Sequence, residues 1–178
     1  MTDTAELQKL LADLPRVGRQ MDSDARTELW TFNWRDRVYH LRFFRRPGFL
    51  GRVAKRFGRT SAMSEFLRLQ WVQKARIPAP RAVAVLMGYR LGKQVGDALI
   101  YEPVLDAQRL DTHLAELQSD GQLQHKHPQI EPQLRLILRA LGEAKLGHAD
   151  LTLASFAIKG PKLHLIDTTS VRPGGMRL

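Results

Sequence analysis

Two aspartates in the last third of the chain, Asp150 and Asp167, flank a predicted β-hairpin and constrain the fold more than any other feature. The apolar runs 156–158 and 163–166 are separated by a Lys-Gly-Pro-Lys turn at 159–162. Apolar runs on both sides of a Gly-Pro turn predict two paired strands. Because Asp150 precedes the first strand and Asp167 follows the second, both carboxylates should lie at the same end of the hairpin.

Two carboxylates brought together from separate loops are suited to phosphoryl transfer. One can orient the acceptor hydroxyl and take its proton, while the other holds Mg²⁺ against the phosphates. The alternative is structural, because Asp is common in turns and caps and a lone His-x-Asp triplet is a weak signal. The second aspartate after the hairpin favours the catalytic interpretation.

Composition limits the classes of partner. The formal net charge of +10 and the pI near 10.5 indicate an anionic partner, such as nucleic acid, a membrane surface or a phosphorylated substrate. The absence of cysteine excludes disulfides, thiolate zinc sites and cysteine nucleophiles. No stretch approaches the roughly 20 apolar residues of a membrane-spanning helix, and the N-terminus does not resemble a signal peptide. A cytoplasmic protein is therefore expected.

Positive charge is concentrated in the basic segment 42–59, which contains seven cationic residues: Arg42, Arg45, Arg46, Arg52, Lys55, Arg56 and Arg59. From Gly48 to Arg59, apolar residues recur at roughly helical spacing opposite these cations, as in an interfacial helix on anionic lipid. The alternative is an amphipathic helix packed on the rest of the fold. Salt-sensitive nucleic-acid binding is a weaker hypothesis, because the nearby aromatic residues alternate as on a buried sheet face.

Periodicity predicts an α+β chain. A short helix over 4–14 ends at Pro15, strands follow at 27–34 and 37–44, and a helix capped by Ser61 or Ser64 runs to about Arg76. The later elements are strands at 81–87 and 98–104, helices at 110–117 and 129–146, and a polar loop over 118–127 between those helices.

The segment Arg76-Ile77-Pro78-Ala79-Pro80-Arg81-Ala82-Val83-Ala84 resembles the Gly-Ile-Pro-x-Pro-x-x-Val segment of the bacterial lipopolysaccharide core kinases that act on heptose and Kdo. The His-x-Asp-Leu loop and the strand ending in Asp167 resemble the same family. The resemblance implies an α+β, protein-kinase-like two-lobed fold with a minimal C-terminal lobe. Residues 1–178 would then form one kinase-like domain, with an N-lobe and hinge over about 16–104 and a reduced C-lobe over about 105–178.

The resemblance also implies roles for individual residues, with ATP and Mg²⁺ as cofactors. Asp150 would be the catalytic aspartate, with His148 supporting its loop, and the metal would lie at Asp167 and Ser155. The nucleotide would be bound by Arg42, its partner Glu65, and the hinge residues Tyr101, Glu102 and Val104. The implied function is ATP-dependent phosphorylation of a sugar hydroxyl in the lipopolysaccharide core or a related envelope glycolipid, on the cytoplasmic side of the inner membrane, with segment 42–59 on the glycolipid or membrane.

Several positions depart from the family pattern. Arg42 stands where lysine is expected, Ser155 stands where asparagine is expected, and the turn 33–36 between the first predicted strands has no glycine. The chain ends 11 residues after Asp167, which suggests a protein partner that completes the C-lobe. A catalytically weak pseudokinase that binds membrane or protein is therefore the alternative. Small-molecule phosphotransferases share the Asp pattern, but their acceptor sites are usually acidic.

Overall fold

The computed structural model describes residues 2–45, 61–121 and 123–174. Segment 46–60, and with it the whole predicted interfacial helix from Gly48 to Arg59, lies outside the described residues. The chain divides into two compact units. Unit 1 comprises Met1–Phe66 and Ala82–Pro103, and unit 2 comprises Leu67–Arg81 and Val104–Leu178. Each unit has its own hydrophobic core.

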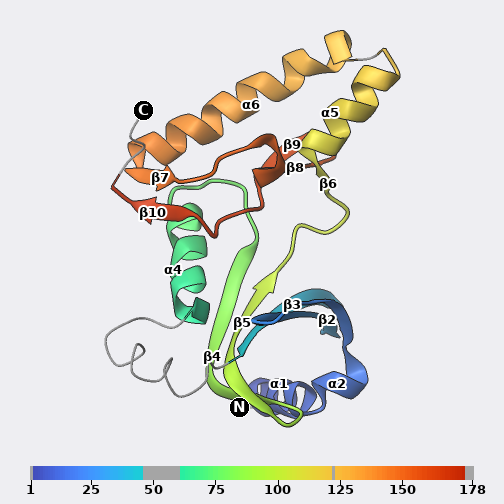
Figure 1. Cartoon of the computed structure of the whole chain (residues 1–178), viewed down its shortest axis with the longest axis vertical. Helices are drawn as coiled ribbons and strands as arrows, with labels where there is room; N and C mark the ends of the chain where they lie inside the picture. The colour runs from blue at the N-terminus through green and yellow to red at the C-terminus, as the bar shows by residue number, and fades with distance from the viewer. Residues whose placement is uncertain (1, 46–60, 122, 175–178) are drawn as a thin grey trace. The chain divides into compact units, whose positions relative to one another are not determined.

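Unit 1 is built on a five-stranded sheet with the order β1-β2-β3-β5-β4 (Figure 1). The strands are β1 (Arg19–Ser23), β2 (Thr27–Trp34), β3 (Arg37–Arg45), β4 (Arg81–Leu91) and β5 (Gln94–Glu102). Strands β2 and β3 confirm the predicted hairpin, and β3 pairs antiparallel with β5. Strand β1 was not predicted from the sequence, because all five of its side chains are exposed and carry no apolar alternation.

Side-chain alternation gives the two faces of this sheet different chemistry. Tyr39, Leu41 and Phe43 of β3 are buried in the unit 1 core, whereas His40 and Arg42 point to the opposite face. Helices α1 (Thr2–Ala12) and α2 (Leu14–Val17) pack on the apolar face (Figure 1). Pro15 does not end the first helix as predicted. It lies in the first turn of α2, where its missing N–H needs no partner.

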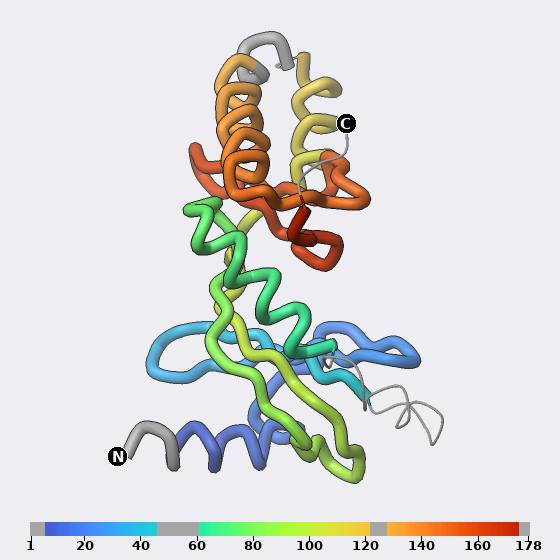
Figure 2. Tube along the Cα trace, turned by 90° about the vertical axis from the view of Figure 1, so that its left-hand side faces the viewer, coloured from blue at the N-terminus to red at the C-terminus, as the bar shows by residue number. Residues whose placement is uncertain are grey.

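Unit 2 contains the C-terminal part of α4 (Ser61–Lys74), together with α5 (Leu110–Ser119) and α6 (Leu123–Glu143). Helices α5 and α6 lie side by side (Figure 2). Helix α6 begins at Leu123, within the segment 118–127 that was predicted to be a polar loop. The helix contains Pro128 and Pro132 in its N-terminal half. No helix among the described residues is long and apolar enough to cross a membrane.

The strands of unit 2 are short. The predicted hairpin is confirmed as β8 (Phe156–Lys159) and β9 (Lys162–Leu165), with Phe156 opposite Leu165 at its open end. Strand β6 (Gln108–Arg109) pairs with β8, and β7 (Leu146–His148) pairs with β10 (Val171–Pro173). The pairing of β7 with β10 brings the chain before Asp150 next to the chain after Asp167.

Candidate active-site residues

In unit 1, Arg42 and Glu65 form an ion pair. Arg42 Nη1 lies 2.5 Å from Glu65 Oε1, and the two side chains are 30% and 11% exposed. Arg42 comes from β3 and Glu65 from α4. Helix α4 begins at Ser61, so Glu65 is its fifth residue. Sequence analysis predicted this pair, and the two side chains do meet.

Tyr101 lies directly opposite His40 across the β3–β5 ladder and belongs to the same polar group. Its hydroxyl is 3.4 Å from His40 Nδ1. Burial raises the pKa of Tyr101, partly opposed by Arg42. Burial lowers the pKa of His40, and the positive charge of Arg42 lowers it further. Both effects favour the neutral form of His40.

The remaining predicted nucleotide-binding residues lie where β5 ends. Glu102 is the last residue of β5 and pairs with Arg37, with Nη1 and Oε1 3.3 Å apart. Val104 is half-buried and is the first residue of unit 2 after the strand, so the boundary between the units falls at 103–104. Tyr101 differs from these two, because its ring is buried and its hydroxyl lies 3.4 Å from His40 Nδ1.

Because β1 precedes β2, the turn between the first two strands lies at residues 24–26. The turn that was predicted to join the first two strands, at 33–36, instead joins β2 to β3. The turn at 24–26 contains no glycine, and its amides are already bonded: Asp24 Oδ1 accepts the N–H groups of Arg26 (2.6 Å) and Thr27 (2.7 Å). These hydrogen bonds lower the pKa of Asp24. The Asp24 carboxylate therefore accepts hydrogen bonds from two backbone N–H groups that could otherwise donate to a phosphate.

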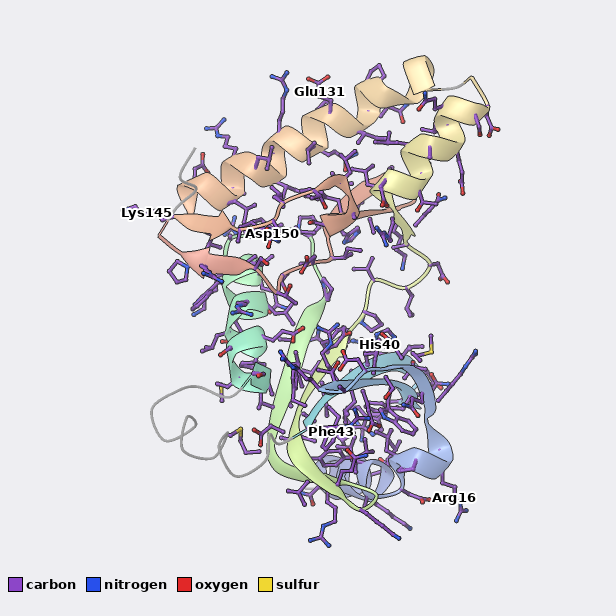
Figure 3. All side chains as sticks on the ribbon, viewed as in Figure 1. Arg16, His40, Phe43, Glu131, Lys145 and Asp150 are labelled. Atoms are coloured by element: carbon purple, nitrogen blue, oxygen red, sulfur yellow. The ribbon has the colours of Figure 1, made fainter. Side chains whose placement is uncertain are left out.

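In unit 2, the loops that carry the two aspartates are joined by hydrogen bonds. His148 Nε2 is 2.9 Å from the backbone oxygen of Asp167, and the Ala149 N–H donates to the Ser170 carbonyl at 3.3 Å. The Ser170 hydroxyl is 3.5 Å from Asp150 Oδ2. Asp150 itself is exposed (Figure 3). The contact of His148 with the Asp167 backbone fits the predicted role of supporting the loop.

Ser155 is almost fully buried and belongs to a capping box of the short 3-10 helix η1 (Leu153–Ser155). Its hydroxyl accepts the Thr152 N–H at 3.2 Å and lies 3.4 Å from the Asp150 carbonyl. Its backbone oxygen accepts the N–H groups of Ile166 and Asp167. Ser155 thus connects the Asp150 loop to the Asp167 loop, and a metal ion would compete for its hydroxyl.

The carboxylate of Asp167 is half-buried and one of its oxygens is bonded within the loop. Oδ1 accepts the N–H of Thr169 at 2.9 Å and its hydroxyl at 2.6 Å. The described residues contain no group of three or more His, Asp or Glu side chains that could hold a metal ion. Magnesium often takes only one or two protein carboxylates and completes its shell with phosphates and water. These donors therefore fit Mg²⁺ that arrives with a nucleotide.

The architecture is shared with proteins of known structure. WaaP in complex with acyl carrier protein superposes with a TM-score of 0.64 and 13% identity, over 92% of this chain and 66% of that chain. A thermostable mutant of the aminoglycoside phosphotransferase APH(4)-Ia, in a ternary complex with AMP-PNP and hygromycin B, superposes with a TM-score of 0.58 and 11% identity, over 94% of this chain and 72% of that chain. The BubR1 kinase domain superposes with a TM-score of 0.59 and 16% identity, over 86% of this chain and 46% of that chain.

These structures show that the fold is α+β and protein-kinase-like, as the sequence predicted. The model of the lipopolysaccharide kinase (Kdo/WaaP) family matches residues 16–169, and the chain belongs to this family. No curated protein matches the chain by sequence. The chain spans 66% of the WaaP chain to which it is similar.

Several residues around these groups were missed by sequence analysis. His40 lies two residues before Arg42 and shares its face, so strict alternation along β3 could have found it. Asp24, Thr169 and Ser170 gave no periodic signal, because their contacts depend on turns. Arg45 was predicted to face an anionic partner, but its Nη2 lies 2.8 Å from Glu28 Oε1 within unit 1.

Proposed function

We propose that this protein transfers the γ-phosphoryl group of ATP to a sugar hydroxyl of the lipopolysaccharide core or a related envelope glycolipid. The observation that carries the proposal is the joining of the Asp150 and Asp167 loops through His148, Ser155 and the β7–β10 pairing. The Arg42–Glu65 ion pair of unit 1 supplies a fixed cation for the phosphates. Family membership supports this class of reaction.

In the proposed reaction, Asp167 holds Mg²⁺ that enters with ATP, and Arg42 binds the phosphates. Asp150 orients the acceptor hydroxyl and accepts its proton as the oxygen attacks the γ-phosphorus. The bond between the γ-phosphorus and the β–γ bridging oxygen breaks, and ADP leaves. His148 keeps the Asp167 backbone in place, and the Glu65 carboxylate holds the guanidinium of Arg42.

The first test is calorimetric binding of MgATP. Wild-type protein and the exposed-site control Asp120→Asn should bind, whereas Asp167→Asn should lose the Mg²⁺-dependent part of the affinity. Asp150→Asn should still bind MgATP but should not transfer radiolabelled phosphate to lipid A that bears Kdo and heptose. Failure of the wild type to bind millimolar MgATP would reject the enzymatic proposal.

A catalytically weak binding module is the second candidate function, and the turn at Asp24 favours it. The Asp24 carboxylate occupies the amides of Arg26 and Thr27, so this turn offers fewer donors to a nucleotide. Asp24→Ala removes the carboxylate. If the wild type does not bind MgATP and Asp24→Ala does, the binding-module hypothesis is favoured. Equal MgATP affinity in both proteins would show that the turn does not limit binding.

We further propose that the protein works on the cytoplasmic side of the inner membrane, with the cations of 46–59 on anionic lipid. Co-sedimentation with vesicles containing phosphatidylglycerol should be lost on combined Arg52→Glu and Lys55→Glu substitution, and at high salt. Binding to phosphatidylcholine vesicles is the control. Equal binding to both kinds of vesicle would contradict an electrostatic interaction.

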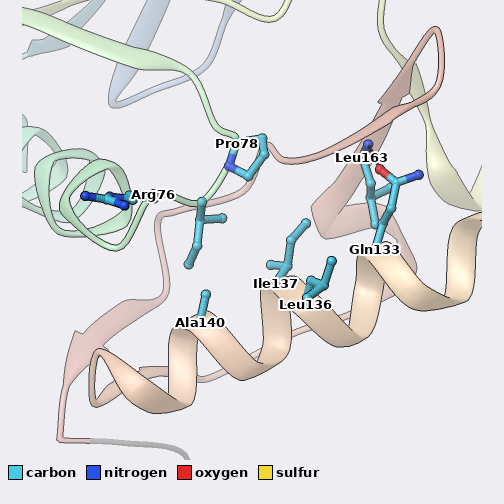
Figure 4. Close-up of a pocket in the computed structure, with 8 residues that line it drawn as sticks. Arg76, Pro78, Gln133, Leu136, Ile137, Ala140 and Leu163 are labelled. Carbon is cyan, nitrogen blue, oxygen red and sulfur yellow. Dashed lines mark hydrogen bonds between the residues drawn. The ribbon is translucent and has the colours of Figure 1, made fainter.

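A protein partner is also proposed, because the WaaP structure contains acyl carrier protein. On unit 2, a hollow of about 230 Å³ is lined by Ile77, Ile137, Ala140 and Leu163 (Figure 4). Leu136, also on its lining, is 65% exposed, and Arg76 adds a positive charge. Acyl carrier protein is the first partner to test by calorimetry. Leu136→Asp should weaken its binding and Val17→Asp, on unit 1, should not; equal affinities would place the partner elsewhere.

A further inference from the structure

A hydroxyl of the chain itself lies against the carboxylate of Asp150. Ser170 Oγ is 3.5 Å from Asp150 Oδ2, and among the described residues it is the one side chain that is hydrogen-bonded to this carboxylate. An ionised carboxylate only accepts hydrogen bonds, so the serine hydroxyl is the donor. A hydroxyl that donates to a carboxylate is the arrangement of a nucleophile with its general base, and without substrate such contacts are often longer than 3.2 Å.

Main-chain contacts hold Ser170 in this position. The Val171 N–H donates to the Thr168 carbonyl at 3.2 Å, which closes a turn that contains Ser170. The Ser170 carbonyl accepts the Ala149 N–H at 3.3 Å. Directly after the turn, Val171 pairs with His148 in the β7–β10 ladder. The backbone therefore presents the hydroxyl to the carboxylate, and a substitution of the serine side chain leaves these contacts in place.

The neighbouring hydroxyl, that of Thr169, has a different partner. Its oxygen lies 2.6 Å from Asp167 Oδ1, which also accepts the Thr169 N–H. Thr169 thus contacts the carboxylate proposed to hold the metal, whereas Ser170 contacts the carboxylate proposed to accept a proton. Ser170 is half-buried and Asp150 is exposed, so solvent and ligands can reach this second pair.

In the proposed reaction, contact with Asp150 defines the position of an acceptor hydroxyl, and Ser170 Oγ already makes that contact. We propose that Ser170 is a self-phosphorylation site, which receives the γ-phosphoryl group of ATP when no glycolipid is bound. The Ser170 oxygen attacks the γ-phosphorus and its proton passes to Asp150. The bond between the γ-phosphorus and the β–γ bridging oxygen breaks, ADP leaves, and phosphoserine is formed. This inference rests on the proposed function, because it uses the same nucleotide and the same base.

The first test supplies radiolabelled ATP and Mg²⁺ without glycolipid. Wild-type protein should incorporate label, and mass spectrometry should locate it on Ser170. Ser170→Ala should lose this site and Ser170→Thr should regain it as phosphothreonine. Asp150→Asn should slow the labelling by about a hundredfold or more, as for loss of a general base. The control Ser119→Ala removes an exposed hydroxyl at the end of α5 and should be labelled like the wild type.

The kinetics of labelling test whether Ser170 and its base act within one molecule. The fraction of protein labelled per minute should not change with protein concentration. Label on another residue, or a fractional rate that rises with protein concentration, would overturn the proposal. Lipid A that bears Kdo and heptose should slow the labelling, because its hydroxyl must replace Ser170 at Asp150. Unchanged labelling at saturating lipid would contradict a shared position.

A second arm needs no nucleotide. Because the chain contains no cysteine, a pair of introduced cysteines reports whether two positions meet. Combined Asp150→Cys and Ser170→Cys substitution should give a disulfide on mild oxidation, whereas combined Asp150→Cys and Ser119→Cys substitution should not. If the first pair formed no disulfide, the two loops would not meet and the proposal would fail.

Calorimetric binding of MgATP separates this inference from the proposed function. Wild-type protein that does not bind MgATP would overturn both. Protein that binds MgATP and phosphorylates the lipid, but carries no label on Ser170 in the absence of lipid, would overturn the inference alone.

Discussion

Arg45 should stabilise unit 1 and should contribute little to binding an anionic surface. Its Nη2 donates to Glu28 Oε1 at 2.8 Å and to Ser23 Oγ at 3.1 Å, and its Nε donates to Gln94 Oε1 at 2.9 Å. It also bonds the Asp24 carbonyl. The Glu28 carboxylate accepts the Trp30 indole N–H at 3.0 Å. Arg45 therefore connects β2 and β5 with the turn after β1.

The expected cost of removing this side chain follows from burial. The Glu28 and Arg45 side chains are 7% and 28% exposed, so Arg45→Met would leave a nearly buried carboxylate without its cation. Breaking a fully buried pair costs about 3–5 kcal/mol. Because Arg45 is partly solvated, we expect a loss of about 2–3 kcal/mol in the free energy of unfolding. For a chain of this size, that lowers the melting temperature by roughly 4–12 °C.

Urea denaturation followed by circular dichroism measures this loss. The control is Arg16→Met, because Arg16 is 85% exposed and its ion pair with Asp13, three residues earlier, is on the surface; it should cost under about 1 kcal/mol. Binding to vesicles with phosphatidylglycerol should be nearly equal for wild type and Arg45→Met. If Arg45→Met kept wild-type stability and lost lipid binding, the assignment of Arg45 to the interior of unit 1 would be wrong.

Three further predictions concern unit 2. Ser155→Ala should lower the free energy of unfolding by about 1 kcal/mol, because it removes the capping box, and Thr152→Val should cost a similar amount; a loss confined to one of them would argue against the box. Gln133→Leu should cost about 1–2 kcal/mol in urea denaturation, because Gln133 bonds Pro161 O and Leu163 N, whereas Gln129→Leu should be nearly neutral. Burial, and then Lys159 and Lys162, lower the pKa of His164 from 6.5, so its neutral form is favoured in the folded protein. Stability is then present above pH 6.5 and declines as the pH falls through the lowered pKa; His164→Gln should reduce the difference in urea midpoint between pH 7 and about pH 5, and an unchanged difference would exclude His164 as its source.

Elements with a strong hydrophobic period were predicted from the sequence. The β2–β3 and β8–β9 hairpins alternate or carry apolar runs beside turn residues, and their pairing matches the prediction. The loops with Asp150 and Asp167 were located for the same reason, because each borders the hairpin. Arg42 and Glu65 were predicted as a pair by resemblance to the kinase family, and they form an ion pair.

Elements without an apolar period were missed. Strand β1 is exposed throughout, so only its pairing with β2 defines it. Strands β6, β7 and β10 have two or three residues each, too few for a period to be recognised. The last long helix was predicted to begin at about 129, but α6 begins at Leu123 and contains Pro128. For the four strands, pairing with a distant or neighbouring segment outweighed the local preference.

Local periodicity and short motifs were enough to predict the α+β class, the kinase-like order of elements and the positions of the two aspartates. Which charges are available became clear from the folded structure alone. Arg45 is bonded inside unit 1, the turn amides are held by Asp24, and Arg42 of β3 pairs with Glu65 of α4. The physical reason is that a charge is neutralised or left free by partners that the fold brings together from distant parts of the sequence.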